Sequence, residues 1–270
     1  MQSRYSGIQW VVQRNVTHST DLEKLKQSCE TRGIYFQGIE VIPFSTTLPD
    51  FDVSRKSIFY GSTTFNKLIA EEEKLRSGLF FDSEKFSISN YFRHWGRHML
   101  NYGAEVTTFK ELMSRDEDPK KLLFVRPDDD SKSFSGETRS FGEIAEWYEQ
   151  LKTIENSGLS LDSPIVVSSP WQIRYEWRLW MVAGRVVTAS KYRTDFRLTK
   201  ERGCPAEVAA FAEARCREYQ PHEVFVMDVC LCGDELFIVE CGCMNAAGFY
   251  QADIDVIVLS VSDWYADNFS

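Results

Sequence analysis

The sequence predicts an α/β protein built from α+β lobes, in about two domains. Three observations predict this fold class. The first 60 residues alternate between short apolar runs and a helical pattern, as a strand–helix–strand unit does. Two long apolar stretches in the second half are each interrupted by a short turn signal, which is typical of hairpins. The length of 270 residues corresponds to about two domains at roughly 150 residues each.

The beginning of the chain is predicted to form a small parallel sheet. Three short runs rich in apolar residues are the expected strands: Ile8–Gln13, Tyr35–Phe44 and Ser57–Tyr60. A helix is predicted over Asp21–Thr31, because apolar residues recur there at spacings of three and four and Gly33 follows as a stop signal. Strands joined by short links around a helix favour parallel pairing.

The rest of the chain is predicted to begin with helices and to end with hairpins. A domain boundary is expected between residues 75 and 120. Helices are predicted at 91–102, 108–114, 141–151, 207–218 and 252–264. Single strands are predicted at 122–126 and 165–167. The hairpins are predicted to pair 175–182 with 185–192 and 224–232 with 236–241.

Composition excludes several classes of protein. The net charge is −9 and the sequence pI is about 5.1. A general nucleic-acid coat or a polybasic membrane binder needs a surplus of Lys and Arg, so neither is expected. No apolar run approaches the roughly 18 residues that suggest a membrane span, and the start lacks a signal-peptide pattern. We therefore expect a cytoplasmic protein whose seven cysteines are reduced thiols.

Two carboxylates in the last hairpin indicate a metal site. A three-residue turn at Gly233–Glu235 would pair Cys232 with Leu236, and Asp228 would then face Glu240 across the ladder. Two acids on one face of an apolar hairpin repel each other and lose hydration, and a bound Mg²⁺ would remove both costs. A turn of even length is the alternative, because it would place the two acids on opposite faces.

Two further segments are candidates for phosphate contacts. The 122–126 strand delivers Arg126 to its end, and the loop over 128–136 offers hydroxyls, backbone N–H groups and the ammonium of Lys132. This loop lacks the Walker A spacing, and a solvated acidic turn is an equal alternative. In the first hairpin, Glu176 and Arg178 alternate on one strand and Lys191 and Arg193 on the other. Such charges line either a solvated sheet face or a groove of cations.

The order of these motifs resembles the ATP-grasp superfamily, and more closely a divergent clade of it that includes a eukaryotic translation-initiation assembly factor and many bacterial and phage proteins. The motifs that carry the resemblance are IFYGST at 58–63, FVRPDDDSKSFSG at 124–136, IVVSSP at 165–170, YEWRLWMVAGRVV at 175–187, FVMDVCL at 225–231 and FIVECGCMNAAGFY at 237–250. The resemblance implies an ATP-grasp fold over residues 91–270 and an N-terminal Rossmann-like pre-ATP-grasp domain over residues 1–90. It also implies ATP and Mg²⁺ as cofactors.

The resemblance assigns roles residue by residue. The implied nucleotide-binding residues are Arg126, Lys132, Ser133, Ser168 and Glu176. Arg178 and Lys191 match cationic positions near the transferring phosphate and are the implied catalytic residues. We expect Arg193, the third candidate catalytic residue, to hold the substrate carboxylate. The implied metal ligands are Asp228, Glu240 and Asn245. The family's usual Glu-x-Asn pattern is broken here because position 242 is Gly, so Asn245 is the candidate for the missing oxygen.

The activity implied by the resemblance is an ATP-dependent carboxylate–amine ligase that forms an amide through an acyl phosphate. Its partners would be ATP, a carboxylate and an amine: an amino acid, a peptide, a protein or a modified base. The alternative is a non-enzymatic ATP-binding assembly factor or chaperone. A kinase is a third option, with a hydroxyl in place of the carboxylate.

Overall fold

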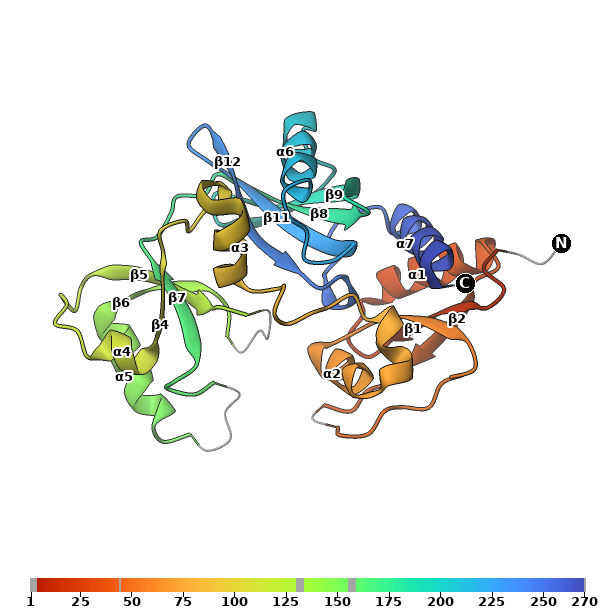
Figure 1. Cartoon of the computed structure of the whole chain (residues 1–270), viewed down its shortest axis with the longest axis horizontal. Helices are drawn as coiled ribbons and strands as arrows, with labels where there is room; N and C mark the ends of the chain where they lie inside the picture. Colours follow the sequence, from red (N-terminus) through yellow and green to blue (C-terminus); the bar gives the residue numbers. More distant parts are fainter. Residues whose placement is uncertain (1–3, 44, 130–133, 155–158, 270) are drawn as a thin grey trace.

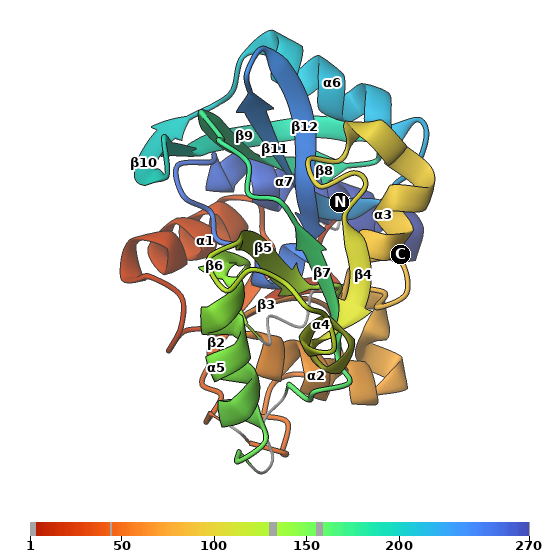
Figure 2. The same ribbon diagram turned by 90° about the vertical axis from the view of Figure 1, so that its left-hand side faces the viewer.

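The computed structural model describes residues 4–43, 45–129, 134–154 and 159–269, which form three sheets with flanking helices (Figure 1). A parallel sheet has the strand order β2-β1-β3. An antiparallel sheet of four strands has the order β4-β7-β5-β6, and one of five strands has the order β10-β9-β8-β11-β12. Figures 1 and 2 place the five-stranded sheet beside both of the others. The predicted α/β class with α+β lobes is confirmed.

The parallel sheet agrees closely with its prediction. It contains β1 (Ile8–Gln13), β2 (Tyr35–Ile39) and β3 (Lys56–Tyr60), and α1 (Ser19–Thr31) joins the first two strands. The strand expected to reach Phe44 ends at Ile39 instead. The reason is that Ile39 pairs with Gln13, where β1 itself ends, so the following residues have no neighbouring strand to pair with.

Both ends of the chain contribute to the core around this sheet. Trp10 and Val12 face α1 and α7 (Ile254–Phe269), and the indole N–H of Trp10 donates to the Ser262 hydroxyl at 2.9 Å. Val11, on the opposite face, packs against α2 (Thr63–Glu71). Successive strand residues point to opposite faces, so both faces of the sheet are covered and every residue of β1 is buried.

The four-stranded sheet has its own core. It comprises β4 (Glu105–Thr108), β5 (Leu122–Pro127), β6 (Glu137–Ser140) and β7 (Pro164–Ser168), with α4 (Phe109–Met113) and α5 (Phe141–Leu151) packed against it. The short strands β4 and β6 were not predicted from the sequence. The helix expected over 91–102 is α3 (Ile88–Trp95), which ends because Gly96 adopts φ +48°.

The five-stranded sheet confirms both hairpins. It comprises β8 (Tyr175–Val182), β9 (Arg185–Thr194), the unpredicted β10 (Arg197–Arg202), β11 (Val224–Cys232) and β12 (Glu235–Gly242). Met227 and Val229 pack under α3 and α6 (Ala206–Cys216). Asp228 between them therefore points to the opposite face, toward the four-stranded sheet.

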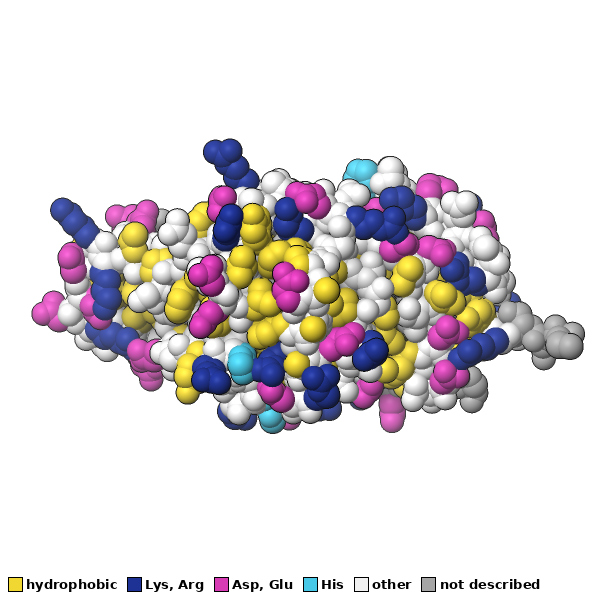
Figure 3. Space-filling model, turned by 90° about the horizontal axis from the view of Figure 1, so that it is seen from above, with side chains coloured by type: hydrophobic (Ala, Val, Ile, Leu, Met, Phe, Trp, Pro, Cys, Tyr) yellow, Lys and Arg dark blue, Asp and Glu magenta, His cyan; other side chains and the backbone are white. Residues whose placement is uncertain are grey.

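The surface carries charges of both signs. On the face shown in Figure 3, Lys and Arg side chains are interspersed with Asp and Glu. Within the described residues, no helix combines the length and hydropathy needed to cross a membrane. In the described residues the seven cysteines form no disulfide with one another. The cytoplasmic location stays a prediction.

Candidate functional site

A cavity of about 480 Å³ lies where the four-stranded and five-stranded sheets face each other (Figure 1). Its apolar lining consists mainly of Leu100, Phe124, Phe134, Trp171, Ile173 and Val239. Its ionisable lining includes Arg126, Glu176, Arg178, Tyr192, Arg193, Asp228, Glu240 and Tyr250. The cavity thus offers both apolar surface, which suits a flat ring, and charged groups, in a volume typical of small-molecule sites.

Asp228 and Glu240 lie opposite each other on β11 and β12, as predicted, but the turn between the strands differs from the predicted one. The turn has two residues, Gly233 and Asp234, since Cys232 pairs with Glu235. A regular ladder from that turn would place Asp228 opposite Val239. A bulge between the Asp228 and Val229 pairings adds one residue on β12, so Asp228 pairs with Glu240. The predicted three-residue turn was wrong, and the bulge restores the predicted pair.

Asp228 takes part in a buried network of charges. Arg178 donates to its two oxygens from Nε and Nη2, at 2.9 and 2.8 Å. The Tyr192 hydroxyl donates to Glu176 at 2.7 Å and contacts Asp228 at 3.2 Å. Arg193 donates to Glu176 at 2.8 Å. The Asp228 and Glu176 side chains are each only 3% exposed, so both acids have their charge balanced by an arginine inside the protein.

The pKa shifts in this network keep its members in their usual protonation states. Burial lowers the pKa of Arg178, but the adjacent Asp228 carboxylate more than compensates and holds that pKa well above its ordinary value. Burial, reinforced by the charges of Asp228 and Glu176, raises the pKa of Tyr192 well above its ordinary value. Burial also raises the pKa of Tyr250. The two tyrosines are therefore neutral hydrogen-bonding groups near neutral pH.

Glu240 is paired with an arginine from the other sheet. Arg126, at the end of β5, forms an ion pair with the Glu240 carboxylate and donates to the Val239 carbonyl at 3.2 Å. This contact joins the two sheets across the cavity. Among the described residues, the buried Nε of Arg126 has no hydrogen-bond partner. Arg126 itself lines the cavity, so its guanidinium has hydrogen-bonding capacity that its protein partners do not use up.

A comparison with protein families identifies the family of this chain. The family model that matches residues 64–261 describes an ATP-grasp domain, the third family of the divergent clade that the motifs resemble. The chain belongs to this ATP-grasp family. The matched residues include the whole cavity lining, so the cavity between the two sheets belongs to the ATP-grasp domain.

Solved structures share this ATP-grasp fold. The RimK domain ATP-grasp protein of Sphaerobacter thermophilus DSM 20745 aligns with a TM-score of 0.59 at 13% identity, over 96% of this chain and 98% of its own. The ATP-grasp ligase PsnB aligns at 0.57 and 11% identity, over 98% and 99%. D-alanine–D-alanine ligase of Bacillus anthracis aligns at 0.54 and 12% identity, over 96% and 93%. A comparison with curated proteins finds no match.

Most of the predicted ATP-grasp site residues line the cavity, but Lys191 does not. The expectation that Lys191 and Arg193 share a face assumed an unbroken period of two. In the structure Glu176 pairs with Arg193 and Trp177 with Lys191, so Tyr192 is an extra residue on β9. Lys191 instead pairs with Glu201 at 2.8 Å and lines a separate cavity on the sheet.

Asn245 also lies away from the cavity. Its side chain is fully buried and donates to the carbonyls of Phe59 and Gly78, at 2.6 and 2.8 Å. Its oxygen accepts from the backbone N–H of Phe80 at 2.8 Å. These bonds join the turn after β12 to β3 and the segment behind it. The structure does not bring Asn245 to Asp228 and Glu240, so we do not include it in the proposed metal site.

The remaining predicted residues lie at the edge of the cavity or outside the described residues. Ser168 donates to the side chain of Asn101, a cavity residue, at 3.3 Å. Lys132 and Ser133 lie outside the described residues, although Phe134 and Gly136, which follow them, line the cavity.

Two tyrosines of the cavity, Tyr192 and Tyr250, were not predicted from the sequence. A β-bulge places Tyr192 in the cavity, and no local pattern in the sequence marks that bulge. Tyr250 lies at the end of the last motif, but nothing in its neighbours distinguishes it from an ordinary core aromatic residue.

Proposed function

We propose that this ATP-grasp protein is an ATP-dependent carboxylate–amine ligase, and that the cavity between the sheets binds the nucleotide. The observation that supports it best is that one cavity is lined both by apolar side chains and by arginines and carboxylates. Apolar surface suits an adenine ring, and arginines suit phosphate oxygens. PsnB, which shares the fold, is described as an ATP-grasp ligase complexed with a precursor variant, Mg and ADP.

Asp228 and Glu240 would hold Mg²⁺, since they supply carboxylate oxygens from one rung of the hairpin to one cavity. When bound, the ion would orient the phosphates and neutralise their charge. Each acid is now paired with an arginine, so metal binding requires Arg178 and Arg126 to share or release it. The released guanidinium groups would then be available to phosphate oxygens.

The proposed reaction has two steps. An oxygen of the substrate carboxylate bonds to the γ-phosphorus while the bond from that phosphorus to the bridging oxygen breaks, and ADP leaves. The amine then attacks the acyl carbon, phosphate leaves with the bonding electrons, and the new amide loses a proton. Arg126 and Arg178 would offset the charge of the moving phosphoryl group, and Arg193, 43% exposed, would hold the substrate carboxylate.

The alternative function is a non-enzymatic ATP-binding factor. One observation favours it: both candidate metal ligands are already neutralised by arginines, and the third predicted ligand, Asn245, is engaged elsewhere. A nucleotide could bind such a cavity without turnover.

ADP release from ATP distinguishes the two functions. The purified chain is incubated with Mg·ATP and panels of amino acids and peptides, and ADP and new amide products are measured by mass spectrometry. ADP release that needs both a carboxylate and an amine supports the ligase. Nucleotide binding with no ADP release across the panels contradicts the ligase and supports the binding factor.

A further inference from the structure

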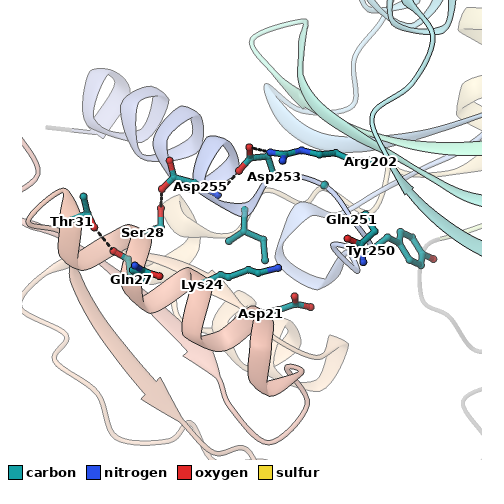
Figure 4. Close-up of a pocket in the computed structure, with 12 residues that line it drawn as sticks. Asp21, Lys24, Gln27, Ser28, Thr31, Arg202, Tyr250, Gln251, Asp253 and Asp255 are labelled. Atoms are coloured by element: carbon teal, nitrogen blue, oxygen red, sulfur yellow. Dashed lines mark hydrogen bonds and ion pairs between the residues drawn. The ribbon is translucent and has the colours of Figure 1, made fainter.

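A second cavity, of about 420 Å³, lies between α1 and the segment that leads into α7 (Figure 4). One side is formed by α1, through Asp21, Lys24, Gln27 and Thr31. These residues recur every three or four positions, so they lie on one face of the helix and span about 15 Å along it. Figure 4 shows the groove extending from Tyr250 at one end to Thr31 at the other.

The groove meets the proposed nucleotide cavity at Tyr250, which lines both. The Tyr250 ring stacks on Tyr192, with 4.8 Å between centroids, and lies 5.2 Å from the Arg178 guanidinium carbon. The next residue, Gln251, is hydrogen-bonded to β9, because its backbone N–H donates to the Ser190 hydroxyl at 3.2 Å. A molecule at this end of the groove would therefore lie close to Tyr250 and to its neighbours in the nucleotide cavity, Tyr192 and Arg178.

Most charged groups in the groove have partners. Asp255 accepts from Arg32 and Ser28, and Asp253 pairs with Arg202 on the side of the groove opposite α1 (Figure 4). Asp21 and Lys24 differ, because neither forms an ion pair with any described residue, nor with the other. They lie one helical turn apart near the Tyr250 end, and the Lys24 side chain extends along the groove toward that end (Figure 4).

We propose that this groove binds a zwitterionic amino acid as the amine substrate of the ligase, with its ammonium group on Asp21 and its carboxylate on Lys24. The ammonium would lose one proton to water before its nitrogen attacks the acyl carbon. An α-amino acid carries two opposite charges close together, and Asp21 and Lys24 place two opposite charges one helical turn apart in one groove. The remaining polar lining, Gln27, Thr31 and Gln251, leaves room for a polar side chain. The proposal rests on the proposed function, since it names the class of one substrate.

The test combines variants on the two faces of α1. Asp21→Asn and Lys24→Gln each remove one groove charge. Glu23→Gln and Lys26→Gln remove the same charges from exposed positions of the same helix that do not line the groove, so they serve as matched controls. Each protein is loaded with Mg²⁺ and a non-hydrolysable ATP analogue. The twenty common amino acids are then titrated, with the shift in melting temperature as the readout.

The best-binding amino acid is next compared with its N-acetyl and amide forms. We expect binding to fall about ten- to a hundredfold in Asp21→Asn and Lys24→Gln and to be unchanged in the controls. We also expect acetylation to weaken binding to the wild type but to cost nothing further in Asp21→Asn. The amide form should behave in the same way toward Lys24→Gln.

Two results would overturn the proposal: equal affinity in the groove and control variants, or no response to any amino acid while the ATP analogue binds. Failure of the ATP analogue to bind would instead contradict the proposed function. In that case the same variants are titrated with amino acids alone, and the same comparison decides whether the groove binds a zwitterion.

Discussion

The ion pair between Arg178 and Asp228 determines how removal of the Asp228 charge should affect the stability of the protein. The sequence predicts two repelling carboxylates, whose neutralisation would relieve strain. In the structure Asp228 is buried against a guanidinium that is itself only 15% exposed. Removing the Asp228 charge therefore leaves a buried cation without its partner, which is costly.

We therefore predict that Asp228→Asn lowers the free energy of unfolding of the ligand-free protein by about 3–5 kcal/mol. Urea unfolding measures it. The double variant Asp228→Asn with Arg178→Met is the control, because it removes the stranded charge and should recover part of the loss. An unchanged stability in Asp228→Asn would show that solvent, rather than Asp228, compensates the charge of Arg178.

His222 should make stability depend on pH. Burial, together with the nearby charge of Lys85, lowers its pKa from 6.5 to about 4. The folded state therefore resists protonation, while the unfolded state accepts a proton below about pH 6.5. The stability that comes from neutral His222 is complete above that pH and is lost as the pH falls toward 4.

We predict a loss of up to about 3 kcal/mol from this group over that range. Unfolding by urea at neutral pH and near pH 4.5, in the wild type and in His222→Gln, isolates the contribution of His222 from that of the carboxylates. Identical pH dependence in the two proteins would mean that His222 is protonated as easily in the folded state as in the unfolded state.

The short 3₁₀ helix η3 (Met244–Ala246) illustrates how one segment holds others together. Its Asn245 side chain satisfies two carbonyls and one N–H of the chain around β3. Deleting that side chain would leave three buried polar groups unsatisfied. The structure thus indicates an architectural role for a residue that the family resemblance suggested as a metal ligand.

We predict that Asn245→Ala destabilises the protein by about 3 kcal/mol or more, with Mg·ATP affinity unchanged when measured below the melting temperature. Asn66→Ala is a suitable control, because the Asn66 side chain lies in the same region and its hydrogen bond to a described residue is a long one, of 4.0 Å, to Cys243. A loss of Mg²⁺-dependent affinity in Asn245→Ala, with stability intact, would restore the metal-ligand assignment.

Across the whole molecule, the distribution of cores determines how the protein should respond to nucleotide. The core of the parallel sheet joins β1 to α7, so it links the two ends of the chain. The core of the four-stranded sheet draws only on residues 109–167. We expect this smaller unit to open more readily than the rest, because fewer elements hold it in place.

Mg·ATP bound between the sheets should therefore slow hydrogen exchange most strongly in β5 and β7. It should also stabilise the whole protein by about 2.7 kcal/mol at a hundredfold excess over the dissociation constant. Hydrogen–deuterium exchange and a thermal scan, with and without Mg·ATP, measure the two effects. Unchanged exchange and melting temperature at millimolar nucleotide would contradict nucleotide binding in this cavity.

Features that depend on local pattern could be predicted from the residues alone. The strands of both hairpins, the helix α1 and the parallel unit follow from residue periodicity and turn signals, which neighbouring residues set. The order of motifs also sufficed for the ATP-grasp family and for six charged residues of the cavity: Arg126, Glu176, Arg178, Arg193, Asp228 and Glu240. The short strands β4, β6 and β10 escaped prediction, because their own residues are mostly polar and give no apolar run. Pairing with β7, β5 and β9 stabilises them instead.

The set of side chains that meet in the cavity depends instead on how the sheets are assembled. A bulge on β12 sets Asp228 opposite Glu240 although the turn is one residue shorter than predicted. A bulge on β9 directs Tyr192, instead of Lys191, into the cavity. Each bulge shifts the alternation of faces by one residue, and the packing of the whole sheet, not the local sequence, selects where it forms. The arginine partners of the two acids come from other strands, so their pairing exists only in the folded chain.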